Sequence, residues 1–130
     1  MTRYLLDSDT VIGILKGAPD AIQLIAELYR QDDTLCTCLV VVAEVYSGLR
    51  PSDAGEADAL LRPMRFLMAA PDIGRQAGRW RYEFGRQGIQ LSAPGCLIAA
   101  TAHYHRATLI TGNIRHFPMT ELATLRLPRR

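Results

Sequence analysis

Four oxygen-bearing side chains follow the first apolar run and are the strongest candidates for chemistry. The apolar run Tyr4–Leu6 ends at Asp7, Ser8, Asp9 and Thr10, and apolar residues resume at Val11. This pattern predicts a buried strand followed by an amphipathic helix that begins near residue 9. Ligands bind at such strand ends in open α/β sheets. The simpler alternative is a capped turn, in which Ser8, Asp9 or Thr10 supplies the one oxygen that a helix start needs.

Two further segments place polar side chains beside predicted elements. Glu44 is the only charged residue in an apolar helix predicted over 41–49, and Thr111 and Asn113 end a short strand predicted over 107–111. A carboxylate in such an apolar helix needs a partner unless it points to water, which is the alternative for Glu44. A parallel sheet would bring these groups to the same edge as Asp7. Clustered oxygen ligands suit Mg²⁺ or Mn²⁺, and such an ion activates water for attack on a phosphodiester.

The remaining elements complete an alternation of strands and helices. Helices are predicted over 9–16, 20–30, 41–49, 52–68 and 73–87, and another follows the cap Ser92 and the first-turn Pro94. Strands are predicted over 34–40, over 107–111 and, at an edge, over 125–127. The expected fold is therefore α/β, one domain over residues 1–130 with a mainly parallel central sheet flanked by helices.

Composition narrows the class of protein. The chain has 48% apolar residues, and no apolar stretch approaches the roughly 20 residues that span a bilayer. We therefore expect a cytoplasmic protein with no membrane association. Cys36, Cys38 and Cys96 form no metal-binding pattern and are expected to be buried apolar residues.

Charge is unevenly distributed along the chain. Residues 1–72 carry a net charge of −5 and residues 73–130 one of +7, with arginine as every late cation. Such asymmetry indicates a polyanionic or acidic partner. Arg75, Arg79 and Arg86 fall near one helix face beside Trp80, and with Arg115 they are candidate RNA contacts. The alternative for the helix is an ordinary solvated face.

Four motifs together resemble the PIN-domain ribonucleases of the VapC toxin type. They are Tyr-Leu-Leu-Asp7-Ser-Asp-Thr-Val-Ile, Val-Ala-Glu44-Val-Tyr-Ser-Gly48, Leu-Ile-Ala-Ala-Thr-Ala, and Thr-Leu-Ile-Thr-Gly-Asn113-Ile-Arg-His-Phe. The resemblance implies that Asp7 and Glu44 bind Mg²⁺ or Mn²⁺, that Asn113 supports the ion with Thr111 beside it, and that Ser8 and Asp9 orient water. It also implies an endoribonuclease acting on structured RNA, often tRNA. A VapB-type antitoxin as partner and a homodimer are implied as well.

Gly95 departs from the pattern of that family. The resemblance implies a metal-binding aspartate at this position in the first turn of its helix, and no aspartate follows Asp72 in the sequence. Glycine supplies no ligand, so we expect a chain that folds but is inactive or impaired as a nuclease. His116 falls in the same motif as Asn113, where we expect a structural role, and His103 and His105 are too close in sequence to share a helix face.

Two other functions fit parts of the sequence. The spacing Asp7-x-Asp9 after a strand also occurs in haloacid dehalogenase-like phosphatases, but the later lysine and paired aspartates of that fold are missing. The stronger alternative is a catalytically silent module that binds an antitoxin or RNA. Gly95 favours this alternative, because Asp7, Asp9 and Glu44 would still attract a cationic partner.

Overall fold

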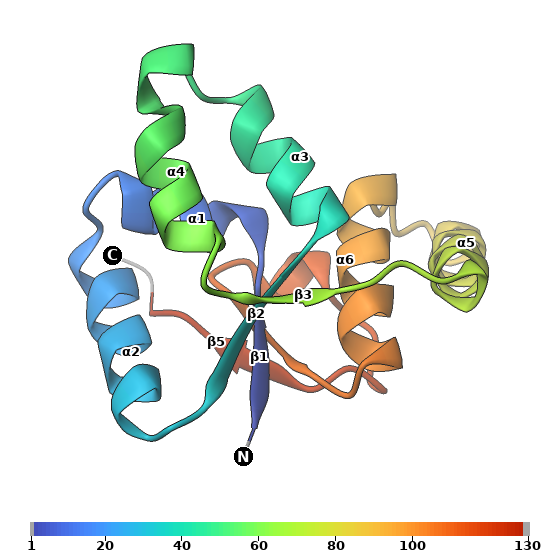
Figure 1. Cartoon of the computed structure of the whole chain (residues 1–130). Coiled ribbons are helices and arrows are strands. Elements are labelled where there is room, and N and C mark those ends of the chain that lie inside the picture. Colours follow the sequence, from blue (N-terminus) through green and yellow to red (C-terminus); the bar gives the residue numbers. More distant parts are fainter. Residues whose placement is uncertain (1, 129–130) are drawn as a thin grey trace.

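A five-stranded parallel sheet forms the centre of the computed structural model, which describes residues 2–128 (Figure 1). The strand order is β3-β2-β1-β4-β5, and every neighbouring pair is parallel. The strands are β1 (Arg3–Leu6), β2 (Thr34–Cys38), β3 (Arg65–Leu67), β4 (Thr108–Thr111) and β5 (Thr124–Arg126). The predicted α/β class and parallel sheet are therefore confirmed.

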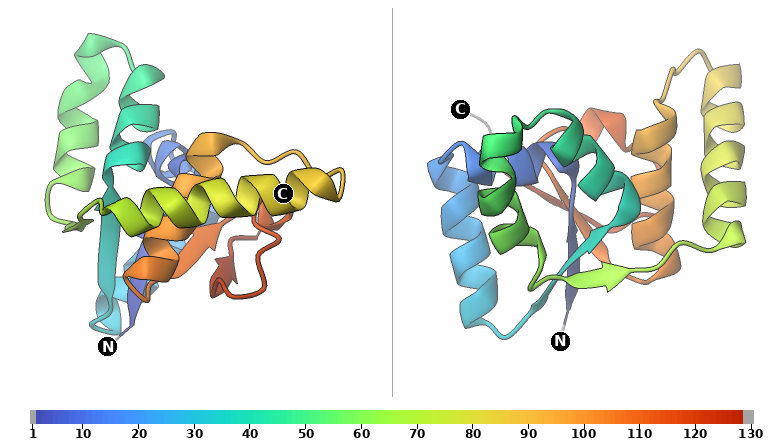
Figure 2. Two further views of the ribbon diagram at one scale, coloured as in Figure 1. Left: turned by 90° about the vertical axis from the view of Figure 1, so that its right-hand side faces the viewer. Right: turned by 45° about the horizontal axis from the view of Figure 1, so that its top comes forward.

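Helices cover both faces of this sheet. They are α1 (Ser8–Leu15), α2 (Pro19–Arg30), α3 (Leu39–Ser47), α4 (Ala54–Leu61), α5 (Pro71–Arg86) and α6 (Ala93–Tyr104), with 3₁₀ turns η1 (Pro51–Asp53) and η2 (Ile114–His116). Figure 1 shows α2 on one side of the strands and α6 on the other. Figure 2 shows the long α5 crossing α6 on its outer side, away from the sheet. No helix within residues 2–128 is long and apolar enough to cross a membrane.

The core is centred on the middle strand β1 and its neighbour β4. Leu5 and Leu6 of β1 and Leu109 and Ile110 of β4 are completely buried. These strands are apolar on both faces because helices cover both faces of the sheet. Cys36, Cys38 and Cys96 are buried free thiols, as expected from their apolar surroundings.

One predicted helix is wrong in its second half. The segment 52–68 forms η1 and α4 and then the strand β3, which pairs with β2 through Thr37 and Phe66. Pro63 is incompatible with a continuing helix because its nitrogen has no hydrogen to donate. The predicted strand 34–40 is also too long, because α3 already begins at Leu39.

The order of the strands creates a favourable position for a ligand site. The chain leaves β1 toward β2 on one side, whereas β4 and β5 lie on the other side of β1. The connections therefore diverge at the carboxyl ends of β1 and β4, and ligands of open parallel sheets bind at such a point. Asp7 follows β1, and Thr111 ends β4 at the same edge.

Candidate active site

Asp7 joins β1 to α1 and is held by bonds to β4 and to α1. Its backbone nitrogen donates to the carbonyl of Ile110 in β4 at 3.1 Å. Its side chain caps α1, because the backbone nitrogen of Thr10 donates to Oδ1 at 2.9 Å. The sequence pattern favours Ser8, Asp9 or Thr10 as the cap, and that prediction is wrong. The capping bond fixes Asp7 at the carboxyl edge of the sheet.

The environment of Asp7 opposes a negative charge. The residue is 5% exposed, and burial raises the pKa of its carboxyl above the usual value of 3.8. Hydrogen bonds from Thr10 and Thr111 act in the opposite direction, and the charge of Asp9 raises the pKa further. A cation that entered the site would relieve this cost, because it favours the ionised form.

Glu44 reaches the site from α3. The Ser8 hydroxyl donates to Glu44 Oε1 at 2.6 Å, a short charge-assisted bond between α1 and α3. Glu44 lines the same pocket as Asp7, so its side chain is not simply directed to bulk water. The fold thus places both carboxylates at the same site, and the bond from Ser8 to Glu44 joins residues 36 positions apart in the chain.

Asn113 and Thr111 support the site from the end of β4. The Asn113 side-chain amide donates to Asp9 Oδ2 at 3.3 Å, and its backbone nitrogen donates to the Thr111 hydroxyl at 3.0 Å. The Thr111 hydroxyl in turn bonds to Asp7. These bonds orient Asp7 and Asp9 at the start of α1.

Gly95 lies in the first turn of α6, on the wall of the same pocket. The Ser92 hydroxyl caps this helix by accepting a bond from the Gly95 nitrogen at 3.0 Å, which confirms the predicted cap. A Cβ atom added at Gly95 would lie only 2.8 Å from Ser92 Oγ. A side chain at position 95 therefore requires the Ser92 hydroxyl to rotate, although no backbone atom blocks it.

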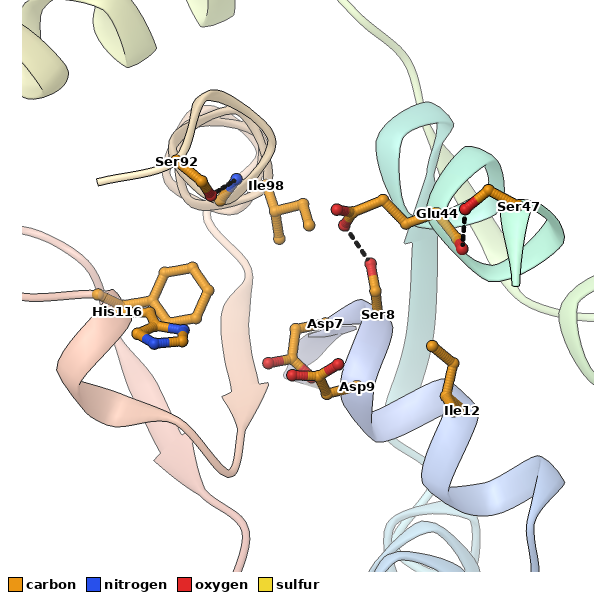
Figure 3. A pocket seen from close by; sticks show the side chains of 11 residues that line it. Asp7, Ser8, Asp9, Ile12, Glu44, Ser47, Ser92, Ile98 and His116 are labelled. Carbon is orange, nitrogen blue, oxygen red and sulfur yellow. Dashed lines mark hydrogen bonds between the residues drawn. The ribbon is translucent and has the colours of Figure 1, made fainter. Parts of the chain in front are cut away.

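One open pocket of about 280 Å³ collects these groups (Figure 3). Asp7, Asp9 and Glu44 extend into the space between the starts of α1 and α6, the helix α3 and the η2 turn. Sequence reasoning missed several of its lining residues, namely Ile12, Ser47, Ser92, Ile98, His116 and Phe117. His116 lies in the η2 turn, and its exposed imidazole ring forms part of the pocket wall.

The donor chemistry of this pocket fits a divalent cation only in part. The carboxylate oxygens of Asp7, Asp9 and Glu44 are hard ligands of the kind that Mg²⁺ and Mn²⁺ prefer. Within residues 2–128, however, no three acidic, histidine or cysteine side chains are close enough to form a metal cluster. Gly95 itself adds no side-chain donor to this set.

The candidate RNA-contacting arginines lie on two elements, α5 and the η2 turn. Arg75 pairs with Asp72, and Arg86 donates to the hydroxyl of Tyr82 and lies over its ring. Arg79 is exposed on the same helix, whereas Trp80 is buried and donates to Glu121. Arg115 lies elsewhere, in the η2 turn next to the pocket.

Comparison with known proteins agrees with this architecture. The PIN domain profile matches residues 4–121. The chain is 34% identical over 117 residues to "Ribonuclease VapC19" of Mycobacterium tuberculosis, covering 88% of this chain and 92% of the relative. It is also 34% identical over 117 residues to "Ribonuclease VapC10" of the same organism, covering 90% and 87%.

Solved structures show the same fold. VapBC2 from Rickettsia felis, bound to a DNA fragment from its promoter, aligns with a TM-score of 0.86 at 22% identity, covering 98% of this chain and all of that chain. VapBC-1 from nontypeable Haemophilus influenzae aligns with a TM-score of 0.83 at 23% identity and the same coverage. The profile and the relatives together show that the chain belongs to the PIN-domain family and, within it, to the VapC type.

Proposed function

We propose that this chain is a VapC-type toxin whose pocket is a divalent-metal endoribonuclease site, impaired by Gly95. The observation that carries the proposal is the convergence of Asp7, Asp9 and Glu44 on a pocket that Gly95 also lines. The relatives named as ribonucleases support the reaction class. We expect Mg²⁺ or Mn²⁺ as the ion and structured RNA, tRNA above all, as the cytoplasmic substrate.

Asp7 and Glu44 would hold the ion, and Asp9 would orient the water beside it. When bound, the ion would supply charge stabilisation and activation of water at the scissile phosphodiester. The Thr10 nitrogen and the Thr111 hydroxyl hold the Asp7 carboxyl, and Asn113 holds Asp9. The Ser8 hydroxyl fixes Glu44. These bonds position the carboxylates before any ligand arrives, which reduces reorganisation during the reaction.

Gly95 is the reason to expect weak activity. An aspartate at this position would stand in the first turn of α6, where the helix dipole favours a negative charge. It would provide a carboxylate from α6, in addition to those from the start of α1 and from α3. Without it, only the start of α1 and α3 would supply carboxylates to the ion, and the attacking water would be poorly positioned.

Cleavage of a total tRNA pool with Mg²⁺ or Mn²⁺ tests this proposal. The natural chain should cut slowly or not at all, and Gly95→Asp should cut on the order of 100-fold faster. Gly95→Asn is the matched control, because it adds a side chain of the same size without charge and should gain little. Gly95→Asp combined with Asp7→Asn should lose the gain. Equal cleavage by the natural chain and Gly95→Asp would show that the role given to position 95 is wrong.

The catalytically silent module is a second candidate, favoured by Gly95 itself. The structural neighbours from Rickettsia felis and Haemophilus influenzae are VapBC complexes, which supports a VapB-type antitoxin as partner. An arginine from such a partner would match the acidic pocket. Calorimetry with an arginine-containing antitoxin segment should show binding that Asp7→Asn weakens. If neither the natural chain nor Gly95→Asp cuts RNA while this binding persists, the silent module is the better description.

A homodimer is the expected assembly. The resemblance to VapC-type toxins implies it, and Leu39 and Met68, which are 61% and 67% exposed, are candidates for the interface. Light scattering after size exclusion should give twice the chain mass of 14.4 kDa. A monomer at protein concentrations typical of such a measurement would contradict this expectation.

A further inference from the structure

A second cavity lies directly beside the acidic pocket and has the opposite charge. It has a volume of about 430 Å³ and is lined by Gly112, Asn113, Ile114, Arg115, His116 and Arg126. No acidic residue is among these. His116 lines both cavities, and Asn113 lines the basic one while bonding Asp9 of the acidic one. The two cavities therefore form one continuous surface with a negative and a positive part.

The register of the sheet explains why the arginines meet there. Thr111, the last residue of β4, pairs with Arg126, the last residue of β5. Leu6 pairs with Ile110, so Asp7, Thr111 and Arg126 follow one another across the carboxyl edge of three adjacent strands. Strands are spaced about 4.8 Å apart, so the backbone of Arg126 lies about two spacings from that of Asp7 along this edge. The η2 turn then adds Arg115 beyond the end of β4.

The two guanidinium groups are available to a ligand. Arg115 and Arg126 are exposed, and neither has an ion-pair partner within the described residues 2–128. By contrast, Arg75 and Arg86 on α5 are already engaged by Asp72 and Tyr82. Arginine binds phosphate with a planar pair of N–H donors, which makes unengaged guanidinium groups suitable for a nucleic-acid backbone.

We propose that this basic cavity binds a phosphate of the RNA strand next to the one that occupies the acidic pocket. The inference rests on the proposed function, because it takes RNA as the occupant of the acidic pocket. A polynucleotide carries one phosphate per nucleotide, so an RNA held at the acidic pocket must place further phosphates close by. Arg115 and Arg126 act here as positioning residues that set the direction in which the strand crosses the sheet edge.

Binding of a short, labelled single-stranded RNA in EDTA tests this proposal without any cleavage. Fluorescence anisotropy should show affinity reduced about 10-fold or more in Arg115→Gln combined with Arg126→Gln. The slope of log K against log salt should fall by about 0.7 for each lost phosphate contact. Arg30→Gln is the control for charge alone: it removes one positive charge, against two in the double variant, at the exposed end of α2, and should change affinity less than about 2-fold.

The outcomes separate this proposal from the proposed function. An unchanged affinity in the double variant, an equal loss in Arg30→Gln, or no RNA binding by the natural chain would overturn the basic subsite. In a cleaving Gly95→Asp background, the double variant should raise KM with little change in kcat. If Gly95→Asp does not cleave but the double variant still weakens RNA binding, the nuclease proposal fails while the subsite stands. If Gly95→Asp cleaves RNA and the double variant changes neither KM nor RNA affinity, the basic subsite is wrong while the nuclease proposal stands.

Discussion

Replacing Gly95 with aspartate should leave the stability of the protein nearly unchanged, although the new Cβ atom meets Ser92 Oγ at 2.8 Å. The contact is relieved when the Ser92 hydroxyl rotates, which breaks its 3.0 Å bond with the residue 95 nitrogen. Loss of a serine cap costs about 1 kcal/mol of helix stability. The free energy of unfolding would fall by that amount if nothing opposed it.

Two gains oppose this loss. Aspartate has a better helix propensity than glycine by about 0.3 kcal/mol. A carboxylate in the first turn of α6 also gains about 0.3–1 kcal/mol from the helix dipole. The sum lies within about 1 kcal/mol of zero, so Gly95→Asp should remain folded and serve as a fair comparison in every functional assay.

Urea unfolding in EDTA at moderate salt measures this balance. Ser92→Ala, alone and with Gly95→Asp, isolates the contact, because it removes the hydroxyl that the new side chain meets. The aspartate should be tolerated slightly better in the Ser92→Ala background than in the natural one. A loss above about 3 kcal/mol in Gly95→Asp that Ser92→Ala does not relieve would refute the reasoning, since it would place the conflict in the backbone of α6.

Three further substitutions test the description of the site and its surroundings. Asp7→Asn should raise the free energy of unfolding at neutral pH in EDTA, because burial raises the Asp7 pKa and the native state resists its ionisation. The gain in free energy of unfolding should appear as pH rises above 3.8 and vanish below it. A difference in free energy between the two proteins that is the same at every pH would contradict this explanation. Ser8→Ala should cost about 1.5 kcal/mol in urea unfolding, because it removes the bond to Glu44; a cost below about 0.3 kcal/mol would show that the bond is immaterial. Thr37→Val should stabilise the protein by about 1 kcal/mol, because the Thr37 hydroxyl is buried without a partner among the described residues. A lower melting temperature in Thr37→Val would count against that explanation.

Local patterns are sufficient to predict most of the fold. An apolar run that stops at a polar cluster marks the ends of β1 and β4, and the Ser92-x-Pro94 start marks α6. These signals are local, because a cap or a buried strand is recognisable within a few residues. The convergence of Asp7 and Glu44 follows from the rule that parallel strands end at a common edge.

The features that sequence reasoning misses depend on contacts distant in the chain. Strand β3 has only three residues, two of them exposed, and it exists because it pairs with β2. Asp7 is not recognisable as the cap of α1 from sequence, because four neighbouring side chains carry a suitable oxygen. The cap is decided by the residue at which the backbone changes from extended to helical. Arg126 is not a candidate from sequence, since its position beside Arg115 depends on the pairing of β4 with β5.

The central claim is that Asp7 and Glu44, with Asp9 beside them, form a cation site that lacks one ligand at position 95. Titration of Mn²⁺ by calorimetry into the natural chain, Gly95→Asp and Gly95→Asn tests it most directly. The aspartate variant should bind Mn²⁺ at least about 10-fold more tightly than the other two. Equal affinity in all three proteins would contradict the claim and would mean that the pocket takes its ligands from elsewhere or holds no ion.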